Sequence, residues 1–455
     1  MEQAPTPTAD APPAPLIPAL TTNKLARFAA IILLYFMQGL PVGLITVAIP
    51  AWLAANGATP IVVGAFVGTT MLPWSLKLFG GLVMDRFTFR PMGRRRSWIL
   101  IAQFGMVLSL IALALVAPGA SEVGALTAIL FAMNLCAVVN DVATDGMTVD
   151  LVPHEERTTI NGMMFASQTL GIAATGFVAG QLLAANNVAL LGVVLSGFAG
   201  CVSFFVSVFR ERPGERMTPW SRGVASAECE ERQHDAWWPI LKGVFKAVAT
   251  PLTLLFLIGL AFTQTTHTFI DAVAPTLAVQ QLGWDSDQYA SFVSVLGTIA
   301  AAAGATLVPL AVKAFGLRTV LYSLITILIA VAVFAGATYD SWQDARLFTA
   351  TFSIQYVLAV CVLIGGVVWA MRICDPAVGA SLFALFMAVP NFSRSFQSGW
   401  SGWVIEAVGY SGAYYVMAFL MVAGLAFYHF ARVGDDRIAF AEEGEDDVEV
   451  QPIRD

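Results

Sequence analysis

The chain has 455 residues, of which 57% are hydrophobic and 12% charged, with a formal net charge of −7 and a mean hydropathy of +0.73. This composition excludes a water-soluble globular protein of the same length, because such proteins carry about 25% charged residues. Most of the chain must be solvated by lipid, which leaves little sequence for a soluble catalytic domain.

Apolar stretches long enough for transmembrane helices recur along the chain, since a bilayer core takes about 20 apolar residues per helix. The first group is predicted at residues 25–54, 60–85, 97–117, 121–151, 160–185 and 188–209. After a polar segment, a second group is predicted at residues 250–280, 288–314, 317–338, 345–373, 378–407 and 411–432. The pattern predicts an all-α integral membrane protein with twelve transmembrane helices in two six-helix bundles.

The same division gives the expected domains. We expect a disordered tail over residues 1–24, a first bundle over 25–209, an inter-bundle loop over 210–249, a second bundle over 250–432 and an acidic tail over 433–455. The N-terminal tail lacks the basic start of a cleavable signal peptide.

The distribution of basic residues predicts the orientation. All but three of the 24 Lys and Arg residues fall on one side of the predicted spans; Arg346 is on the other side, and Lys77 and Arg394 lie inside helices. Basic residues near helix ends are retained in the cytoplasm. We therefore expect both termini and the inter-bundle loop to be cytoplasmic.

Ionisable residues inside the first predicted bundle indicate a site, because a charge within a bilayer costs several kcal/mol and usually faces a cavity or a partner. Lys77 precedes Asp85 by eight residues and so lies about 12 Å inside the membrane. Asn134, Asp141 and Asp145 are spaced by seven and four, which places them on one helical face at a similar depth. We predict a lysine–carboxylate cluster that binds solute or couples protons; the alternative is a structural ion pair between packed helices.

The second predicted bundle carries further polar faces. Gln264, His267 and Asp271 are spaced by three and four, and Asn391 and Arg394 by three. The charge of Arg394 needs an anion, either a protein carboxylate or a bound solute, whereas a lone histidine such as His267 is more often a hydrogen-bonding filler. The full set predicted to bind solute or couple protons is Lys77, Asp141, Asp145, Asn134, Gln38, Gln168, Gln264, His267, Asp271, Asn391 and Arg394.

Between the second and third predicted helices the chain reads Gly81-Leu-Val-Met-Asp85-Arg86 and then Gly93-Arg94-Arg95-Arg96. This resembles the cytoplasmic loop signature of the major facilitator superfamily, with several extra residues between its two parts. Lys77 and the segment Asn140-Asp141-Val-Ala-Thr-Asp145-Gly146 are similar to the branch of AmpG-type muropeptide permeases and acetyl-CoA transporters, whose members usually have Gln in place of Asn140. The likeness extends to residues 35–41 and 383–404.

The resemblance implies two bundles that rock about a central site. It also implies that Lys77, Asp141 and Asp145 bind solute or couple protons. It further implies a cytoplasmic gate between the bundles, formed by Gly81, Asp85, Arg86, Gly93, Arg94, Arg95 and Arg96.

The predicted function is secondary active transport by alternating access, with proton-coupled uptake of a bulky anionic organic solute such as a muropeptide. The alternatives are a siderophore or acyl-CoA-type transporter of the same fold and a non-transporting membrane assembly factor or sensor. We expect no enzyme, because the chain has no Walker motif, nucleophile elbow or metal-binding helix.

We also expect no cofactor or metal, since the five cysteines are far apart. The expected partners are a small-molecule solute, protons and membrane lipid, without nucleic acid. We expect a monomer in the bacterial inner membrane.

Overall fold

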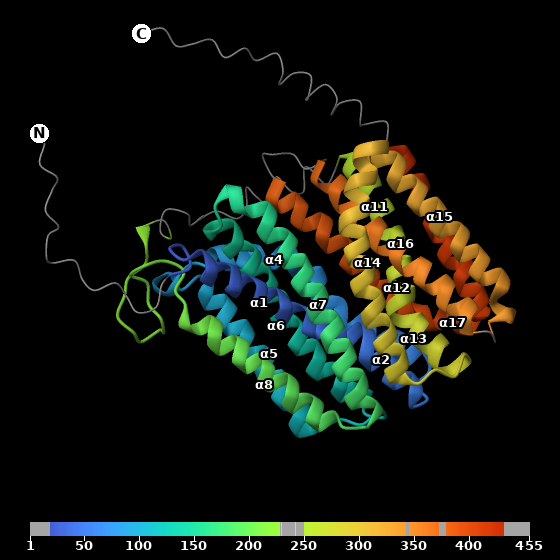
Figure 1. Ribbon diagram of the computed structural model, residues 1–455, viewed down its shortest axis with the longest axis horizontal. Coiled ribbons are helices and arrows are strands. Elements are labelled where there is room, and N and C mark those ends of the chain that lie inside the picture. Colours follow the sequence, from blue (N-terminus) through green and yellow to red (C-terminus); the bar gives the residue numbers. More distant parts are fainter. Residues whose placement is uncertain are drawn as a thin grey trace, which may run out of the picture.

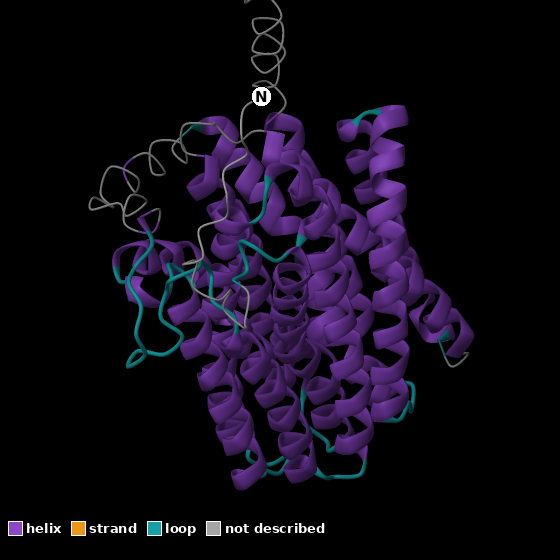
Figure 2. Ribbon diagram, turned by 60° about the vertical axis from the view of Figure 1, so that its left-hand side comes forward, coloured by secondary structure: helices purple, strands orange, loops and turns teal. Residues whose placement is uncertain are grey.

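The computed structural model describes residues 19–227, 229, 242, 250–342, 345–372 and 379–431. Within this part of the chain every regular element is a helix (Figure 2). The predicted acidic tail, residues 1–18 and most of residues 228–249 lie outside the described residues.

The first group of helices begins at Lys24. In chain order it contains α1 (Lys24–Gly43), α2 (Ile49–Ala55), α3 (Pro60–Met71), α4 (Lys77–Arg86), α5 (Arg96–Val116), α6 (Val123–Leu151), α7 (Arg157–Ala184) and α8 (Val188–Val208). The second group contains α11 (Pro251–Thr263), α12 (Thr265–Thr268), α13 (Ala274–Thr276), α14 (Ser286–Phe315), α15 (Leu317–Thr338), α16 (Ala345–Arg372) and α17 (Gly379–Ala431).

These helices form twelve membrane spans. Ten helical stretches of the described chain are long and apolar enough to cross a membrane. An eleventh span is α3 continued by α4, and α17 supplies a twelfth because its backbone turns at Gly409, where φ is +70°. The protein is therefore a multi-pass membrane protein, and the predicted spans agree with the observed helix ends to within three residues.

Local sequence explains where several spans begin and bend. Thr59 and Thr250 each accept a hydrogen bond from the backbone N–H three residues further along, and a proline occupies the first helical position after each. A hydroxyl cap followed by proline is a strong helix start. The second span is interrupted by a 3₁₀ turn over Leu72–Leu76 that contains Pro73, since proline cannot donate the helical hydrogen bond.

Two spans also contain π-helical segments. One lies at Leu44–Ala48 between α1 and α2, and two more lie at Phe269–Val273 and Leu277–Gln281 on either side of α13. Each π segment shifts the helical register of the side chains that follow, and such segments occur frequently at functional sites.

The side chains pack into two hydrophobic cores, one within each group of helices. The exchange between them is small and reciprocal: Val47 and Ala51 pack into the second core, and Ala272 packs into the first. The two bundles lie side by side (Figure 1); α3 packs against α17 and α7 against α14, and α2 also meets α13.

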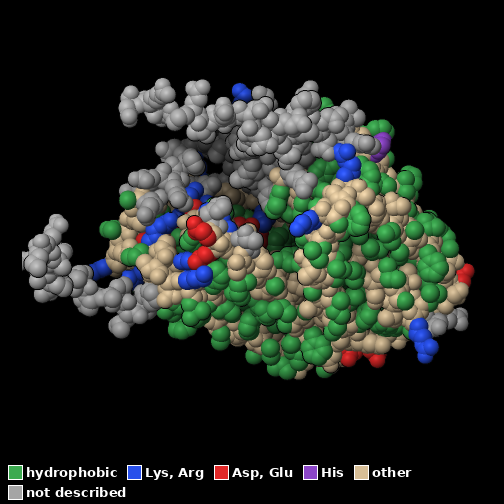
Figure 3. Space-filling model, turned by 45° about the horizontal axis from the view of Figure 1, so that its top comes forward, with side chains coloured by type: hydrophobic (Ala, Val, Ile, Leu, Met, Phe, Trp, Pro, Cys, Tyr) green, Lys and Arg blue, Asp and Glu red, His purple; other side chains and the backbone are tan. Residues whose placement is uncertain are grey.

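The outer faces of the helices expose large apolar side chains, including Phe104, Leu115, Phe204 and Phe419. The sides of the molecule in Figure 3 are accordingly hydrophobic, whereas Lys and Arg gather at one end. We call the end that carries Arg86, Arg94–Arg96 and Arg210 the basic end, and the end that carries the α2–α3 turn the opposite end. Apolar sides between polar ends fit a protein whose solvent is lipid.

At the basic end, residues 209–227 fold back onto the loop between α4 and α5; we call them the linker clasp. The buried carboxylate of Glu211 accepts hydrogen bonds of 2.5–2.9 Å from the backbone N–H groups of Arg94, Arg95 and Arg96. These groups form the free N-terminus of α5, where a negative charge is favoured. Gly93 allows this approach, because its φ is +98° and a Cβ there would lie 2.7 Å from the Glu211 carboxyl carbon.

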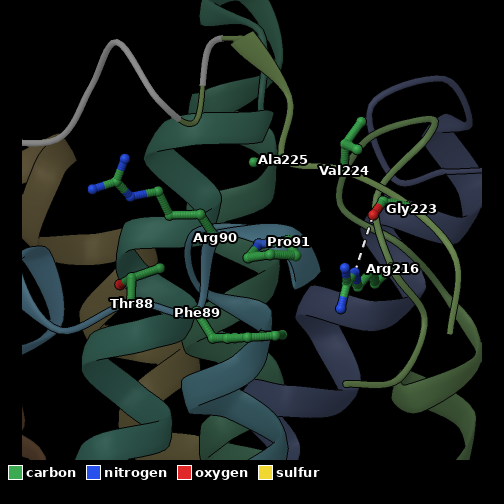
Figure 4. A pocket seen from close by; sticks show the side chains of 8 residues that line it. All are labelled: Thr88, Phe89, Arg90, Pro91, Arg216, Gly223, Val224 and Ala225. Carbon is green, nitrogen blue, oxygen red and sulfur yellow. Dashed lines mark hydrogen bonds between the residues drawn. The ribbon is translucent and has the colours of Figure 1, made fainter. Parts of the chain in front are cut away.

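Further contacts hold the linker clasp in place. Arg216 N–H donates to the carbonyl of Pro91 at 2.6 Å, and Arg96 Nη1 donates to the carbonyl of Met217 at 2.7 Å. Within the clasp, Arg216 Nε donates a hydrogen bond of 3.0 Å to the carbonyl of Gly223 (Figure 4). A cavity of about 450 Å³ remains between the clasp and the loop.

The linker clasp is predicted to loosen as pH rises. Burial, and then the neighbouring Glu211 carboxylate, raise the pKa of Glu215 to about 7. Because this lies above the ordinary value for glutamate, about 4.3, the closed clasp binds the proton more tightly than the released clasp. Its stability is therefore highest at low pH and falls as pH rises towards 7.

The stability of the linker clasp can be measured by hydrogen exchange of peptides from residues 209–227, corrected for the intrinsic effect of pH on exchange. We expect exchange to become several-fold faster between pH 5.5 and 8, and Glu215→Gln to remove most of the change. Glu155→Gln, at an exposed position of the same end, is the matched control. If these peptides of the wild type were instead better protected from exchange at higher pH, protonation of Glu215 would not stabilise the clasp.

Candidate functional site

The predicted lysine–carboxylate cluster is present in the first bundle. Lys77 Nζ, at the start of α4, lies 2.5 Å from Asp141 Oδ2 and 2.9 Å from Asp145 Oδ2 on α6. The Asp141 side chain is 4% exposed, Lys77 19% and Asp145 37%. The cluster thus runs from a buried carboxylate to a partly exposed one, although all three residues belong to membrane spans.

A tyrosine completes this cluster, and the sequence analysis did not place it in the site. The hydroxyl of Tyr35 on α1 donates a hydrogen bond to Asp145 Oδ1. Asp145 therefore has two donors, Tyr35 and Lys77. Asp141 Oδ2 contacts only the ammonium group of these two, at 2.5 Å. The two carboxylates are thus held unequally.

Asn134 lies on the same face of α6, as its spacing predicts, but it serves the packing of helices. Its Oδ1 accepts a hydrogen bond from Trp74 Nε1 at 3.0 Å, and its Nδ2 donates to the carbonyl of Thr70 at 2.6 Å. Asn134 is fully buried. These bonds join α6 to α3 and the 3₁₀ turn, and so fix the position of Lys77 just beyond that turn.

The second bundle holds a separate ion pair. Arg394 Nε on α17 donates to Asp271 Oδ2 in the π segment Phe269–Val273. The anion that Arg394 requires is therefore a protein carboxylate. His267 is buried one turn earlier, and its Nε2 has no hydrogen-bond partner among the described residues. Gln264 is also buried.

The remaining predicted polar residues are dispersed. Gln168 Nε2 donates to Gln38 Oε1 at 3.3 Å, which joins α7 to α1 inside the first bundle. Asn391 donates to the carbonyl of Met387 in its own helix at 2.9 Å. The structure thus brings the first-bundle charges together and pairs Asp271 with Arg394, but it does not gather the other residues around either cluster.

The predicted gate residues lie at the basic end and make contacts within the first bundle. Arg94 Nη1 and Arg95 Nε lie 3.5 and 3.6 Å from Asp150 Oδ2 at the end of α6. Arg96 and Gly93 belong to the contact with the linker clasp described above. Arg86 is exposed and Gly81 faces Val142, while the side chain of Asp85 lies outside the described residues.

The bundles approach most closely in their middle and at the opposite end. Ser395 Oγ donates to the carbonyl of Gly68, and a Cβ on Gly402 would lie 2.3 Å from the backbone of Ile61. Gly180 meets Ala290 in the same way. Figure 3 shows a hollow between the bundles on the face at the basic end. Among the described residues, the bundles are therefore in close contact at the opposite end and are separated by this hollow at the basic end.

Comparison with known proteins assigns this arrangement to a family. The model of the Major Facilitator Superfamily matches residues 31–308. The anhydromuropeptide permease of Escherichia coli is 23% identical over 415 residues, which cover 88% of this chain and 78% of the permease. The folate-biopterin transporter of Synechocystis sp. is 28% identical over 388 residues, covering 81% and 73%.

Solved structures share the fold. A bacterial homolog of the human lysosomal transporter Spinster, in an inward-facing and occupied conformation, superposes with a TM-score of 0.69. Its sequence identity is 14%, and the match covers 90% of this chain and 97% of that one.

The Asp271–Arg394 pair is predicted to be needed for stability rather than to be free for a ligand. Asp271→Asn leaves a buried guanidinium without its carboxylate, and breaking a buried pair on one side costs about 3–5 kcal/mol. We expect a clearly lower midpoint of thermal unfolding for the purified protein in detergent. The double variant Asp271→Leu/Arg394→Met should recover most of the loss, because it removes both charges.

Glu406→Gln, at an exposed carboxylate of the opposite end, is the control and should leave the midpoint unchanged. A double variant no more stable than Asp271→Asn would show that the ion pair is not the source of the effect.

Proposed function

The chain belongs to the major facilitator superfamily, and we propose that it takes up a bulky anionic organic solute of the muropeptide class together with protons, by alternating access. That it is a secondary transporter of this superfamily follows from the family match. The observation that carries the rest is the Lys77 ammonium, shared by two carboxylates inside a membrane span.

The orientation is part of the proposal. The basic end would face the cytoplasm, because Lys and Arg accumulate there. The hollow in Figure 3 then opens inward, and the state described is inward-open. The bacterial inner membrane is the expected location, since the similar permease is bacterial.

The charge of the first-bundle cluster supports coupling to protons. Lys77 contributes +1 and the two aspartates contribute −2 when both are ionised, so the cluster carries a net negative charge that repels an anion. One proton makes it neutral. The ammonium of Lys77 is then attracted less strongly by the aspartates and can pair with a carboxylate of the solute. Proton binding would thus precede binding of the anionic solute.

Asp141 is the better candidate for the proton. It is the more deeply buried carboxylate, and Tyr35 donates to Asp145 rather than to it. Asp145 accepts hydrogen bonds from both Tyr35 and Lys77 and is more exposed than Asp141. Hydrogen bonds to a carboxylate favour its ionised form, whereas burial disfavours it. Asp145 would stay charged and position Lys77 while Asp141 gains and loses the proton.

The second-bundle pair would have a different role. Asp271 and Arg394 sum to zero charge and satisfy each other, so Arg394 would hold the seventh span against α17 rather than bind the solute. The positive charge available to the solute would then come from Lys77 alone.

The class of solute is open to a direct test, because a ligand that binds only the folded state raises its thermal stability. We expect anhydromuropeptides to raise the unfolding midpoint of the detergent-purified protein. Folate and biopterin form a competing arm, suggested by the transporter from Synechocystis sp.. Siderophores and CoA esters complete the screen. A shift with folate and none with muropeptides would overturn the proposed class.

Proton coupling is predicted to fail in Asp141→Asn. In proteoliposomes with an imposed pH gradient, this variant should lose gradient-driven accumulation but retain exchange of labelled for unlabelled solute, because a neutral residue mimics the protonated, solute-binding form. Asp145→Asn should weaken solute binding instead, since it removes the group that positions Lys77. If Asp145→Asn alone abolished the response to the gradient, the two roles would be reversed. If neither variant abolished the response to the gradient, transport would not be coupled to protons through this cluster.

A further inference from the structure

One glutamine joins the bundles where they close. Gln280 is in the last turn of the seventh span, within the π segment Leu277–Gln281. Its Nε2 donates to the carbonyls of Ala54 at 2.9 Å and Ala58 at 2.8 Å. Both acceptors belong to the first bundle. The side-chain amide of Gln280 has two N–H donors, and both donate hydrogen bonds across the bundle interface.

The acceptors are backbone carbonyls at the end of α2 and in the turn that follows it. α2 stops at Ala55, and the chain turns through Gly57, whose φ is +81°, into α3. Within the first bundle, the carbonyl of Ala54 also accepts a hydrogen bond of 3.1 Å from the backbone N–H of Gly57. Gln280 adds donors to this turn from the other bundle, so these two hydrogen bonds form only while the bundles are in contact.

The other polar contact at this end is weaker. Gln181 Nε2 lies 3.5 Å from Asp287 Oδ2 and 3.4 Å from Ser291 Oγ, at the limit for a hydrogen bond. The remaining close approaches, such as Gly402 to Ile61, are apolar packing between small residues and backbone. Gln280 thus makes the shortest side-chain hydrogen bonds between the bundles at the opposite end.

Water can replace these bonds when the bundles separate. A cavity of about 350 Å³ lies beside them and is lined by residues of both bundles, among them Asn56, Asn186 and Asp287. Once the end opens, the carbonyls and the amide can all be hydrated, so the change of state leaves no buried polar group unsatisfied.

We propose that Gln280 is a positioning residue that stabilises the state closed at the opposite end and so sets the ratio of the two access states. The inference rests on the alternating access of the proposed function but not on the identity of the solute or on proton coupling. Two neutral hydrogen bonds exchanged for water change such a ratio by roughly tenfold.

The test uses Gln280→Glu, which keeps the shape of the side chain but removes both donors. Hydrogen exchange is measured on the full-length protein in lipid nanodiscs, without solute. We expect faster exchange in peptides from residues 49–66 and 276–292 and slower exchange in peptides from residues 77–96, because closing the basic end accompanies opening of the opposite end. A merely destabilising change would speed exchange at both ends.

Gln281→Glu is the matched control, since Gln281 is the adjacent residue of the same π segment and is exposed. It should leave exchange at both ends unchanged. Gly402→Leu is the positive control for rocking, because its side chain would collide with the backbone of Ile61 at the same end.

The outcomes separate the two ideas. A reciprocal response to Gly402→Leu but not to Gln280→Glu would overturn the role of Gln280 and leave alternating access standing. No reciprocal response in either variant would overturn alternating access and the inference together. Equal responses to Gln280→Glu and Gln281→Glu would also overturn the inference, because the effect would then come from added charge.

Discussion

The ammonium of Lys77 between two aspartates is the interaction on which the site depends. A charge inside a membrane span costs several kcal/mol unless a partner or water meets it, and Lys77 meets Asp141 and Asp145 at 2.5 and 2.9 Å. The geometry requires α4 and α6 to lie at a fixed distance. The 3₁₀ turn before Lys77 and the two hydrogen bonds of Asn134 supply that constraint, so residues outside the charged cluster determine where the charge of Lys77 lies.

The two bundles differ in how their charges balance. The first holds one cation and two anions, and the second holds one of each. The first cluster has one carboxylate more than it has cations, so it becomes neutral when it binds a proton or a cationic ligand. The Asp271–Arg394 pair is already neutral. Because each bundle has its own hydrophobic core, each charge set can move as part of its own bundle. Under the proposed function, the first bundle would therefore carry the group that responds to protons or solute.

The sequence was sufficient for the spans and for the main cluster, because both follow from periodicity and from the cost of burying charge. It left two possibilities open for Arg394, since Asp271 lies 123 residues away and no local pattern joins them. Tyr35 went unnoticed because a tyrosine within an apolar helix has no distinctive spacing. Glu211 went unnoticed for the opposite reason: a glutamate in a polar segment is normally solvated, and only the fold brings it to the N-terminus of α5.

The contact made by Glu211 lies on a path to the central charges. Its carboxylate holds the backbone of Arg94 to Arg96, and the side chain of Arg95 passes so close to α6 that a Cβ on Gly146 would lie 2.6 Å from its Nε. Gly146 directly follows Asp145, and Asp150 on the same helix forms ion pairs with Arg94 and Arg95. α6 is thus a single rigid element with the site residues at one level and the arginine contacts one to two turns away. A displacement of the loop between α4 and α5 at the basic end must therefore either carry α6 and its aspartates along or break the contacts of Arg94 and Arg95 with Asp150.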